Sequence, residues 1–217
     1  MSLFAIIPCY NEEKTIADVI DITQKHVDHV VVVDDGSADN TEAIAQLTGV
    51  TVLRHDVNLG KGAALKTGCD YAYMHHASKM VVLDGDGQHD ANEIPRFVEA
   101  LKKNDIVFGS RTFSKEMPSV LKKGNEGLNL IVQLLYGVKL KDTQSGFRAF
   151  TVESYKKIRW TATDYSMESE MIANVGKNKL RYKELEIKTK YLDRYKGTTV
   201  VDGLKIGMSM LLWRLRK

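Results

Sequence analysis

Short apolar runs alternate with amphipathic stretches along the first half of the chain. The apolar runs have the length of strands, and most are followed by apolar positions spaced as on one face of a helix. The pattern predicts strands at residues 3–8, 30–33, 50–53, 80–83 and 106–108, and helices at residues 12–26, 41–47, 62–74 and 93–102. Strands and helices that alternate in this way predict an α/β fold with a mostly parallel sheet covered on both faces.

The stretch from residue 80 to residue 89 joins a strand pattern to two carboxylates. Its apolar run ends abruptly at Asp84 and Asp86, and Gln88 follows. Parallel sheets bind ligands at the carboxyl ends of their strands. Two carboxylates and an amide oxygen suit a hard divalent cation such as Mg²⁺ or Mn²⁺, which in turn suits a diphosphate. The alternative for this stretch alone is a solvated Asp-Gly turn between a strand and a helix.

Polar residues also follow other predicted strands. Tyr10 and Glu12 come after the first strand, Asp35 after the second, and Arg111 after the fifth. If neighbouring strands are parallel, these groups lie along one edge of the sheet, which is the outline of a nucleotide site. An isolated strand-end aspartate is more often a helix cap or turn former, the role expected for Asp39.

Composition and glycine spacing exclude several classes. The 217 residues are 43% hydrophobic and 27% charged, which is ordinary for one soluble domain over residues 1–217, and a net charge of +3 does not indicate a nucleic-acid partner. Gly60 and Gly62 follow the third strand and lack the third glycine of a Rossmann loop, and no P-loop is present. No signal peptide is visible and no apolar run approaches the roughly 18 residues that cross a bilayer. We expect a protein that is cytoplasmic or attached to a membrane surface.

Six short motifs are specific as an ordered set. They are residues 8–13 (PCYNEE), 34–37 (DDGS), 60–64 (GKGAA), 84–88 (DGDGQ), 109–111 (GSR) and 145–148 (SGFR). With these motifs the chain resembles the inverting glycosyltransferases of family 2, which have the GT-A fold. Within that family it looks most like the dolichyl-phosphate mannose synthases and other polyprenyl-phosphate glycosyltransferases. The resemblance extends from Phe4 to about Arg194.

The resemblance implies a donor site built from several strand ends. The residues that match nucleotide-binding positions of the family are Pro8, Tyr10, Glu12 and Asp35, with Asp84, Gly85 and Asp86 completing the donor site. A carboxylate can accept hydrogen bonds from base N–H groups or ribose hydroxyls. Asp34 is expected to brace the turn. Lys61 either adds positive charge near the phosphates or is a solvated lysine at a helix start.

The resemblance also implies a metal site. Asp84, Asp86 and Gln88 match the metal-binding motif of the family. The cation, Mg²⁺ or Mn²⁺, would bridge the donor diphosphate and neutralise charge on the departing nucleoside diphosphate.

On the acceptor side, the resemblance implies that arginines hold the phosphate of a lipid. Arg111 matches a phosphate-binding arginine of the family, and Lys122 or Lys123 falls where the family has a second basic group. Arg148 and Arg194 are further candidates. The planar guanidinium fork suits an anionic oxygen. Surface salt bridges are the alternative for each of these residues.

The sequence predicts no catalytic base. The Gln-x-x-Arg-Trp motif of polysaccharide-building members is missing, because Arg159 and Trp160 lack the glutamine. A sugar hydroxyl needs a general base to attack, whereas a phosphate monoester, with a second pKa near 6, is already largely anionic at neutral pH. Glu168 is similar to an acidic residue in the acceptor half of the family, but no role is assigned to it.

Residues 200–217 predict an amphipathic C-terminal helix with two apolar stripes. One stripe can dock on the domain, and the other, near Trp213 and several basic residues, suits an anionic membrane surface. A homodimer interface or a more deeply buried helix is the alternative. The segment from Val120 to Tyr136 is a second apolar candidate for membrane contact.

Together these features predict an enzyme that moves a sugar, with inversion, from a UDP- or GDP-sugar to a polyprenyl or dolichyl phosphate at the cytoplasmic membrane face. Two other functions stay open. One is the same fold acting on a soluble, glycan or protein acceptor. The other is a nonenzymatic protein that binds nucleotide sugars, which an intact set of metal ligands argues against.

Overall fold

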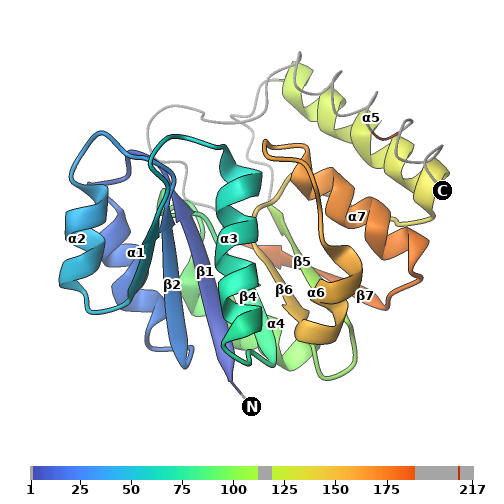
Figure 1. Cartoon of the computed structure of the whole chain (residues 1–217). Coiled ribbons are helices and arrows are strands. Elements are labelled where there is room, and N and C mark those ends of the chain that lie inside the picture. Colours follow the sequence, from blue (N-terminus) through green and yellow to red (C-terminus); the bar gives the residue numbers. More distant parts are fainter. Residues whose placement is uncertain (1, 112–118, 189–209, 211–217) are drawn as a thin grey trace.

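The computed structural model describes residues 2–111, 119–188 and 210, with the side chains of residues 119–126 outside this description. Within these residues, seven strands form one sheet in the order β3-β2-β1-β4-β6-β5-β7 (Figure 1). The strands are β1 (Leu3–Cys9), β2 (His29–Asp34), β3 (Thr51–Arg54), β4 (Lys79–Val82), β5 (Ile106–Arg111), β6 (Arg148–Thr151) and β7 (Tyr182–Ile187). The helices are α1 (Ile16–Thr23), α2 (Thr41–Leu47), α3 (Lys61–Met74), α4 (Ile94–Ala100) after a 3₁₀ turn (Ala91–Glu93), α5 (Ser119–Tyr136), α6 (Val152–Ile158) and α7 (Met167–Lys177).

Strand β6 is the one strand of this sheet that runs against its neighbours. It pairs antiparallel with β4 on one side and with β5 on the other, whereas the remaining pairs are parallel. The predicted mostly parallel sheet is therefore confirmed. Because Arg148 pairs with both Val82 and Phe108, the start of β6 lies beside the carboxyl ends of β4 and β5.

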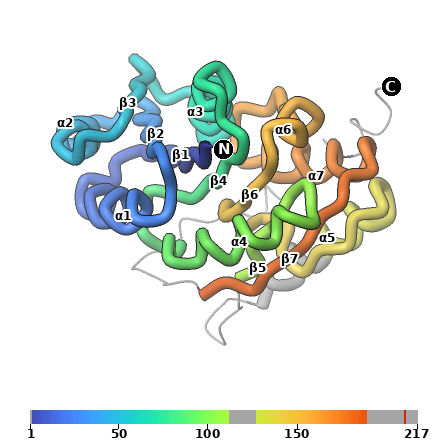
Figure 2. The backbone as a smooth tube through the Cα atoms, turned by 90° about the horizontal axis from the view of Figure 1, so that it is seen from below, coloured from blue at the N-terminus to red at the C-terminus, as the bar shows by residue number. Residues whose placement is uncertain are grey.

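Helices cover both faces of the sheet. Phe4 and Ile6 of β1 belong to a core that includes residues of α3, α6 and α7. Ala5 and Ile7 belong to a second core that includes residues of α1, α2 and α4. Figure 2 shows α1 and α4 on one side of the strands and α3 and α6 on the other. Successive side chains of a strand alternate between faces, so a strand buried on both faces must be apolar throughout.

Helix α1 begins later than the sequence pattern predicts. The pattern places a helix at residues 12–26, but α1 spans Ile16–Thr23. Asn11 has a left-handed φ of 56°, and the backbone N–H of Glu12 donates to the hydroxyl of Thr41 at 2.8 Å. The residues before α1 are thus held in a turn that contacts the start of α2.

The predicted C-terminal helix at residues 200–217 lies outside the described residues, except for Met210. Met210 is fully buried, and its carbonyl oxygen accepts a hydrogen bond of 2.5 Å from the hydroxyl of Tyr136 at the end of α5. Within the described ranges, no helix combines the length and apolar character needed to span a membrane. A single domain over residues 1–217 stays a prediction.

Candidate active site

The carboxyl ends of β1, β2 and β4 are joined directly by backbone hydrogen bonds. The N–H of Asp35 donates to the carbonyl of Cys9 at 2.9 Å, and the N–H of Gly85 donates to the carbonyl of Pro8 at 3.3 Å. The hydroxyl of Thr15 donates to the carbonyl of Gly85 at 2.8 Å. The structure therefore brings the expected donor-site segments together at one edge of the sheet.

Asp84 lies between Lys61 and His89. Its Oδ1 lies 2.8 Å from Lys61 Nζ, and its Oδ2 lies 3.8 Å from His89 Nδ1. Burial raises the pKa of Asp84, but the charges of Lys61 and His89, the hydrogen bond from Lys61 and the charge of Arg111 outweigh burial and hold the pKa below its usual value. Sequence reasoning missed His89, although it lies in the same loop, only five residues after Asp84.

Asp86 lacks such compensation. Its Oδ1 accepts a 3.0 Å hydrogen bond from the backbone N–H of Gln88, but burial and the negative charge of Asp84 raise its pKa. The negative charge of Asp84 disfavours a second charge on Asp86. A divalent cation bound to both carboxylates would remove this repulsion. No cluster of three His, Cys, Asp or Glu side chains among the described residues forms a metal cage. Mg²⁺ commonly binds through one or two carboxylates plus substrate phosphates, so the residues present fit that cation.

Lys61 links two parts of the chain that are far apart in sequence. Besides Asp84, its Nζ contacts Glu168 Oε1 at 3.1 Å. The two carboxylates raise the pKa of Lys61 despite its burial. Lys61 is thus an ion-paired residue of the site and not a solvated lysine. Lys61 therefore bridges Asp84 and Glu168, which lies at the start of α7.

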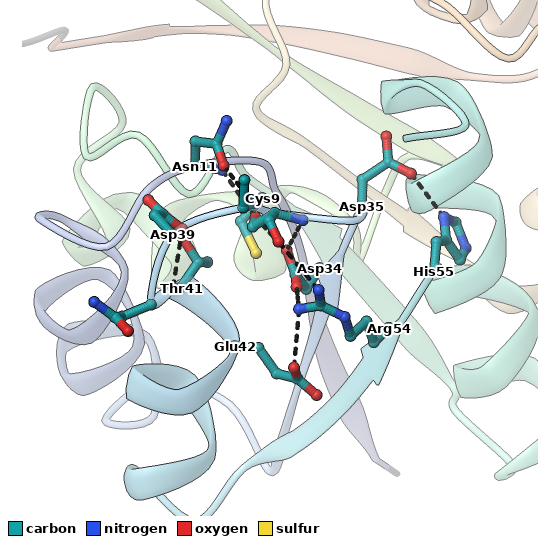
Figure 3. Close-up of polar contacts among 12 residues, drawn as sticks. Cys9, Asn11, Asp34, Asp35, Asp39, Thr41, Glu42, Arg54 and His55 are labelled. Carbon is teal, nitrogen blue, oxygen red and sulfur yellow. Dashed lines mark hydrogen bonds and ion pairs between the residues drawn. The ribbon is translucent and has the colours of Figure 1, made fainter. Parts of the chain in front are cut away.

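Asp34 and Asp35 both brace loops (Figure 3). Asp34 accepts hydrogen bonds from both the N–H and the hydroxyl of Ser37, and from Arg54 Nη1 at 2.6 Å. Asp35 is paired with His55 Nδ1 at 2.7 Å and accepts from the N–H groups of the two residues before Lys61 at 3.0 and 2.8 Å. The sequence predicts a bracing role only for Asp34. Nucleotide binding by Asp35 stays a prediction.

Tyr10 and Glu12 occupy the loop after β1. Tyr10 is 45% exposed, and the Asn11 side-chain oxygen accepts from the N–H of Ala38 at 2.9 Å. This loop is therefore tied to the loop after β2. The fixed pair of loops leaves the Tyr10 ring accessible for contact with a ligand.

Arg111 is held in place by an aspartate that sequence reasoning missed. Its Nε and Nη2 donate to the two oxygens of Asp142 at 2.7 and 3.1 Å, and Asp142 is buried. The backbone N–H of Asp142 donates in turn to Glu184 of β7 at 3.1 Å. A bidentate pair of this kind fixes the plane of the guanidinium. Arg111 therefore has a defined orientation at the edge where Asp84 lies.

Arg148 requires a correction. The sequence predicts it to be a phosphate ligand, but it is only 1% exposed, and burial lowers its pKa to about 10. Its guanidinium donates to the backbone carbonyls of Thr143, Ser145 and Glu168 at 3.0, 3.1 and 2.9 Å. It lies over the ring of Phe108. Arg148 joins the segment before β6 to α7, and its buried guanidinium is engaged by backbone carbonyls. The remaining phosphate candidates, the side chains of Lys122 and Lys123 and residue Arg194, lie outside the described residues.

The match to known proteins decides the family. The model of the family described as "Glycosyl transferase family 2" matches residues 4–159, which include β1 to β6 and the Asp84 loop. The chain belongs to this family. It is therefore a glycosyltransferase, as its motifs predicted.

Two relatives align with this chain over most of their length. It is 35% identical over 243 residues to UDP-N-acetylglucosamine–dolichyl-phosphate N-acetylglucosaminyltransferase of Methanococcus voltae, covering 99% of this chain and 97% of that protein. It is 27% identical over 221 residues to polyprenol monophosphomannose synthase of Mycolicibacterium smegmatis, covering 94% of this chain and 83% of that protein. Both relatives are named for products or acceptors that contain a polyprenyl-type phosphate.

A solved structure agrees with the fold. Glucosyl-3-phosphoglycerate synthase from Mycobacterium tuberculosis, in complex with Mn²⁺, UDP and phosphoglyceric acid, matches with a TM-score of 0.77 at 21% identity. The match covers 98% of this chain and 78% of that one. The predicted GT-A fold is therefore confirmed.

Proposed function

We propose that this glycosyltransferase moves a sugar from a nucleoside diphosphate sugar to a polyprenyl phosphate. The observation that carries the proposal is that an acidic site and a basic site lie at the same edge of the sheet. An acidic pair at the end of β4 suits the metal-bound diphosphate of a donor, and the Arg111–Asp142 pair at the end of β5 suits an anionic acceptor. Arg111 is close enough to lower the pKa of Asp84. The names of the relatives support an acceptor of the dolichyl or polyprenyl phosphate class.

On the donor side, Asp84 and Asp86 would hold Mg²⁺ or Mn²⁺, with Gln88 beside them. When bound, the cation supplies Lewis-acid neutralisation of the departing nucleoside diphosphate. Tyr10 offers an accessible ring to the base, and the loops braced by Asp34 and Asp35 support it. Lys61 keeps a positive charge beside Asp84, and His89 Nδ1 accepts from the backbone N–H of Asp84 at 3.3 Å.

On the acceptor side, the phosphate of the lipid is itself the nucleophile. Its second pKa near 6 leaves it largely anionic at neutral pH, so attack on the anomeric carbon needs no protein base. Arg111, oriented by Asp142, would position the phosphate for in-line attack and inversion. The contribution of the protein is therefore placement and charge.

A lipid acceptor implies action at a membrane, and we propose the cytoplasmic face with the protein attached peripherally. On α5, Leu130 and Leu134 are 56% and 75% exposed and lie one helical turn apart. An exposed apolar pair on a helix supports contact with the interfacial region of a bilayer. The alternative is that a second copy of the chain covers Leu130 and Leu134 in a homodimer.

The test is transfer of radiolabelled sugar into an organic-extractable product. Purified protein is given UDP-N-acetylglucosamine, or other UDP- and GDP-sugars, with a short polyprenyl phosphate and Mg²⁺ or Mn²⁺. We expect labelled lipid with one donor, and none after EDTA treatment. Metal-dependent release of nucleotide without labelled lipid would contradict the lipid acceptor and point to a soluble one. Binding of a nucleotide sugar without turnover under any acceptor would contradict an enzymatic role.

Gly146 gives a test of the position of Asp84. A Cβ at residue 146 would lie 2.6 Å from Asp84 Oδ2 and 2.9 Å from Oδ1, closer than real Cβ atoms approach oxygen. We expect Gly146→Ala to displace the Asp84 carboxylate and to reduce transfer by at least about tenfold, because a misplacement of about 1 Å in a site can cost about 10²-fold in rate. Gly127→Ala is the matched control, because a Cβ there meets nothing within 4 Å. Full activity of folded Gly146→Ala would contradict the placement of Asp84.

A further inference from the structure

The Lys61 ammonium is shared between two carboxylates from different elements. Its Nζ lies 2.8 Å from Asp84 Oδ1 and 3.1 Å from Glu168 Oε1. The side chains of Lys61 and Glu168 are 18% and 4% exposed, so water screens this contact little. The Lys61 ammonium therefore already neutralises Asp84 through contact with its Oδ1.

Glu168 has capacity that this arrangement does not use. Its Oε2 is buried and has no hydrogen-bond partner among the described residues, a condition shared there only by the Ser145 hydroxyl. An unpaired buried carboxylate oxygen is costly. An ammonium that moves away from Asp84 by rotation of its side chain would find both oxygens of Glu168 within reach.

The backbone around this pair is fixed. The carbonyl of Glu168 accepts from Arg148 Nη1 at 2.9 Å, and the N–H of Gly62 donates to the carbonyl of Thr163 at 2.7 Å. Trp160 Nε1 donates to the carbonyl of Gly62 at 2.8 Å. The start of α3 and the start of α7 are therefore held, and the flexible part is the Lys61 side chain.

We propose that Lys61 is the resident counter-ion of Asp84 and that Glu168 receives Lys61 when a divalent cation binds to Asp84. The inference rests on the proposed function, because it takes Asp84 as a ligand of the cation. An ammonium 2.8 Å from a ligand oxygen repels an incoming cation, and withdrawal to Glu168 relieves that repulsion. Lys61 and Glu168 are positioning residues that set the affinity of the site for the cation.

The test measures Mn²⁺ affinity of the purified full-length protein by electron paramagnetic resonance, with and without UDP. We expect Lys61→Met to bind Mn²⁺ at least about tenfold more tightly than wild type, since a neighbouring unit charge shifts the proton affinity of a carboxylate by about 1–3 pKa units. Lys61→Arg, which keeps the charge, should stay close to wild type. Lys25→Met, a loss of the same charge at an exposed position of the surface, is the matched control and should change nothing.

Glu168 is tested in two backgrounds. We expect Glu168→Gln to weaken Mn²⁺ binding in the wild type, because Lys61 loses the group to which it moves. In the Lys61→Met background the same change should have little effect. If Glu168 acted only as a negative charge near the cation, it would weaken binding equally in both backgrounds, and the proposed role of Glu168 would be overturned.

The two levels of inference fail in different ways. Unchanged or weaker Mn²⁺ binding by folded Lys61→Met, in a series where the wild type binds Mn²⁺, would overturn the role of Lys61 alone. Failure of the wild type to bind Mn²⁺ with or without UDP would overturn the metal site of the proposed function, and this inference with it. If Lys61→Met does not fold, Lys61→Gln removes the same charge with a neutral polar side chain, and the same tighter Mn²⁺ binding and the same lack of effect of Glu168→Gln are expected in that background.

Discussion

Replacing Asp86 with alanine should abolish metal-dependent sugar transfer while the protein stays folded. Asp86 makes no ion pair among the described residues, and burial together with the charge of Asp84 raises its pKa, so its charge is not needed for folding. In the proposed site it is one of two carboxylates that hold the cation. Loss of one preorganised electrostatic group of this kind commonly costs about 10²–10³-fold in rate, and loss of a metal ligand should cost at least that much.

The measurement is the initial rate of labelled lipid formation at saturating Mn²⁺, with thermal unfolding followed in parallel. Asp90→Ala is the matched control, because Asp90 is a nearby carboxylate whose side chain accepts from the N–H of Asn92 at the start of the 3₁₀ turn. It should lose roughly 1 kcal/mol of stability through the missing cap and keep its transfer rate. Full activity of folded Asp86→Ala would remove Asp86 from the metal site.

The position of the candidate site could be predicted from the sequence. Parallel sheets bind ligands at the carboxyl ends of their strands, and a short apolar run is enough to identify such a strand. The run before Asp84 is apolar at every position, as a strand buried on both faces must be. Its carboxylates therefore had to emerge at a strand end. The same reasoning placed Pro8, Asp35 and Arg111, and the structure puts the carboxyl ends of their strands at the same edge of the sheet.

The partners of these residues could not be predicted, because they depend on tertiary contacts. Lys61 contacts Glu168, which lies 107 positions later in the sequence, and Arg111 contacts Asp142, which lies 31 positions later. Both pairs depend on β6 lying antiparallel between β4 and β5, and local periodicity carries no information about that order. The burial of Arg148 has the same origin, since its carbonyl partners come from the loop before β6 and from α7.

Replacing Arg148 with methionine should destabilise the whole protein and not only weaken acceptor use. The change removes the donors for three backbone carbonyls, of Thr143, Ser145 and Glu168. Methionine fills similar space but donates no hydrogen bond. Breaking a buried charged network by removing one partner typically costs about 3–5 kcal/mol, so we expect a loss of that size in the free energy of unfolding.

Urea unfolding checks this expectation, with Arg181→Met as the matched control. Arg181 is an exposed arginine whose ion pair with Asp105 is screened by water, so its loss should change the urea midpoint little. A ligand role for Arg148 gives the opposite result, because a side chain kept for an acceptor phosphate would raise the KM for lipid while leaving the urea midpoint unchanged. A stable Arg148→Met protein with only that kinetic defect would restore Arg148 to the acceptor site. Loss of stability would instead make Arg148 the residue that holds the Ser145 segment and the start of α7 around Asp84 and Lys61.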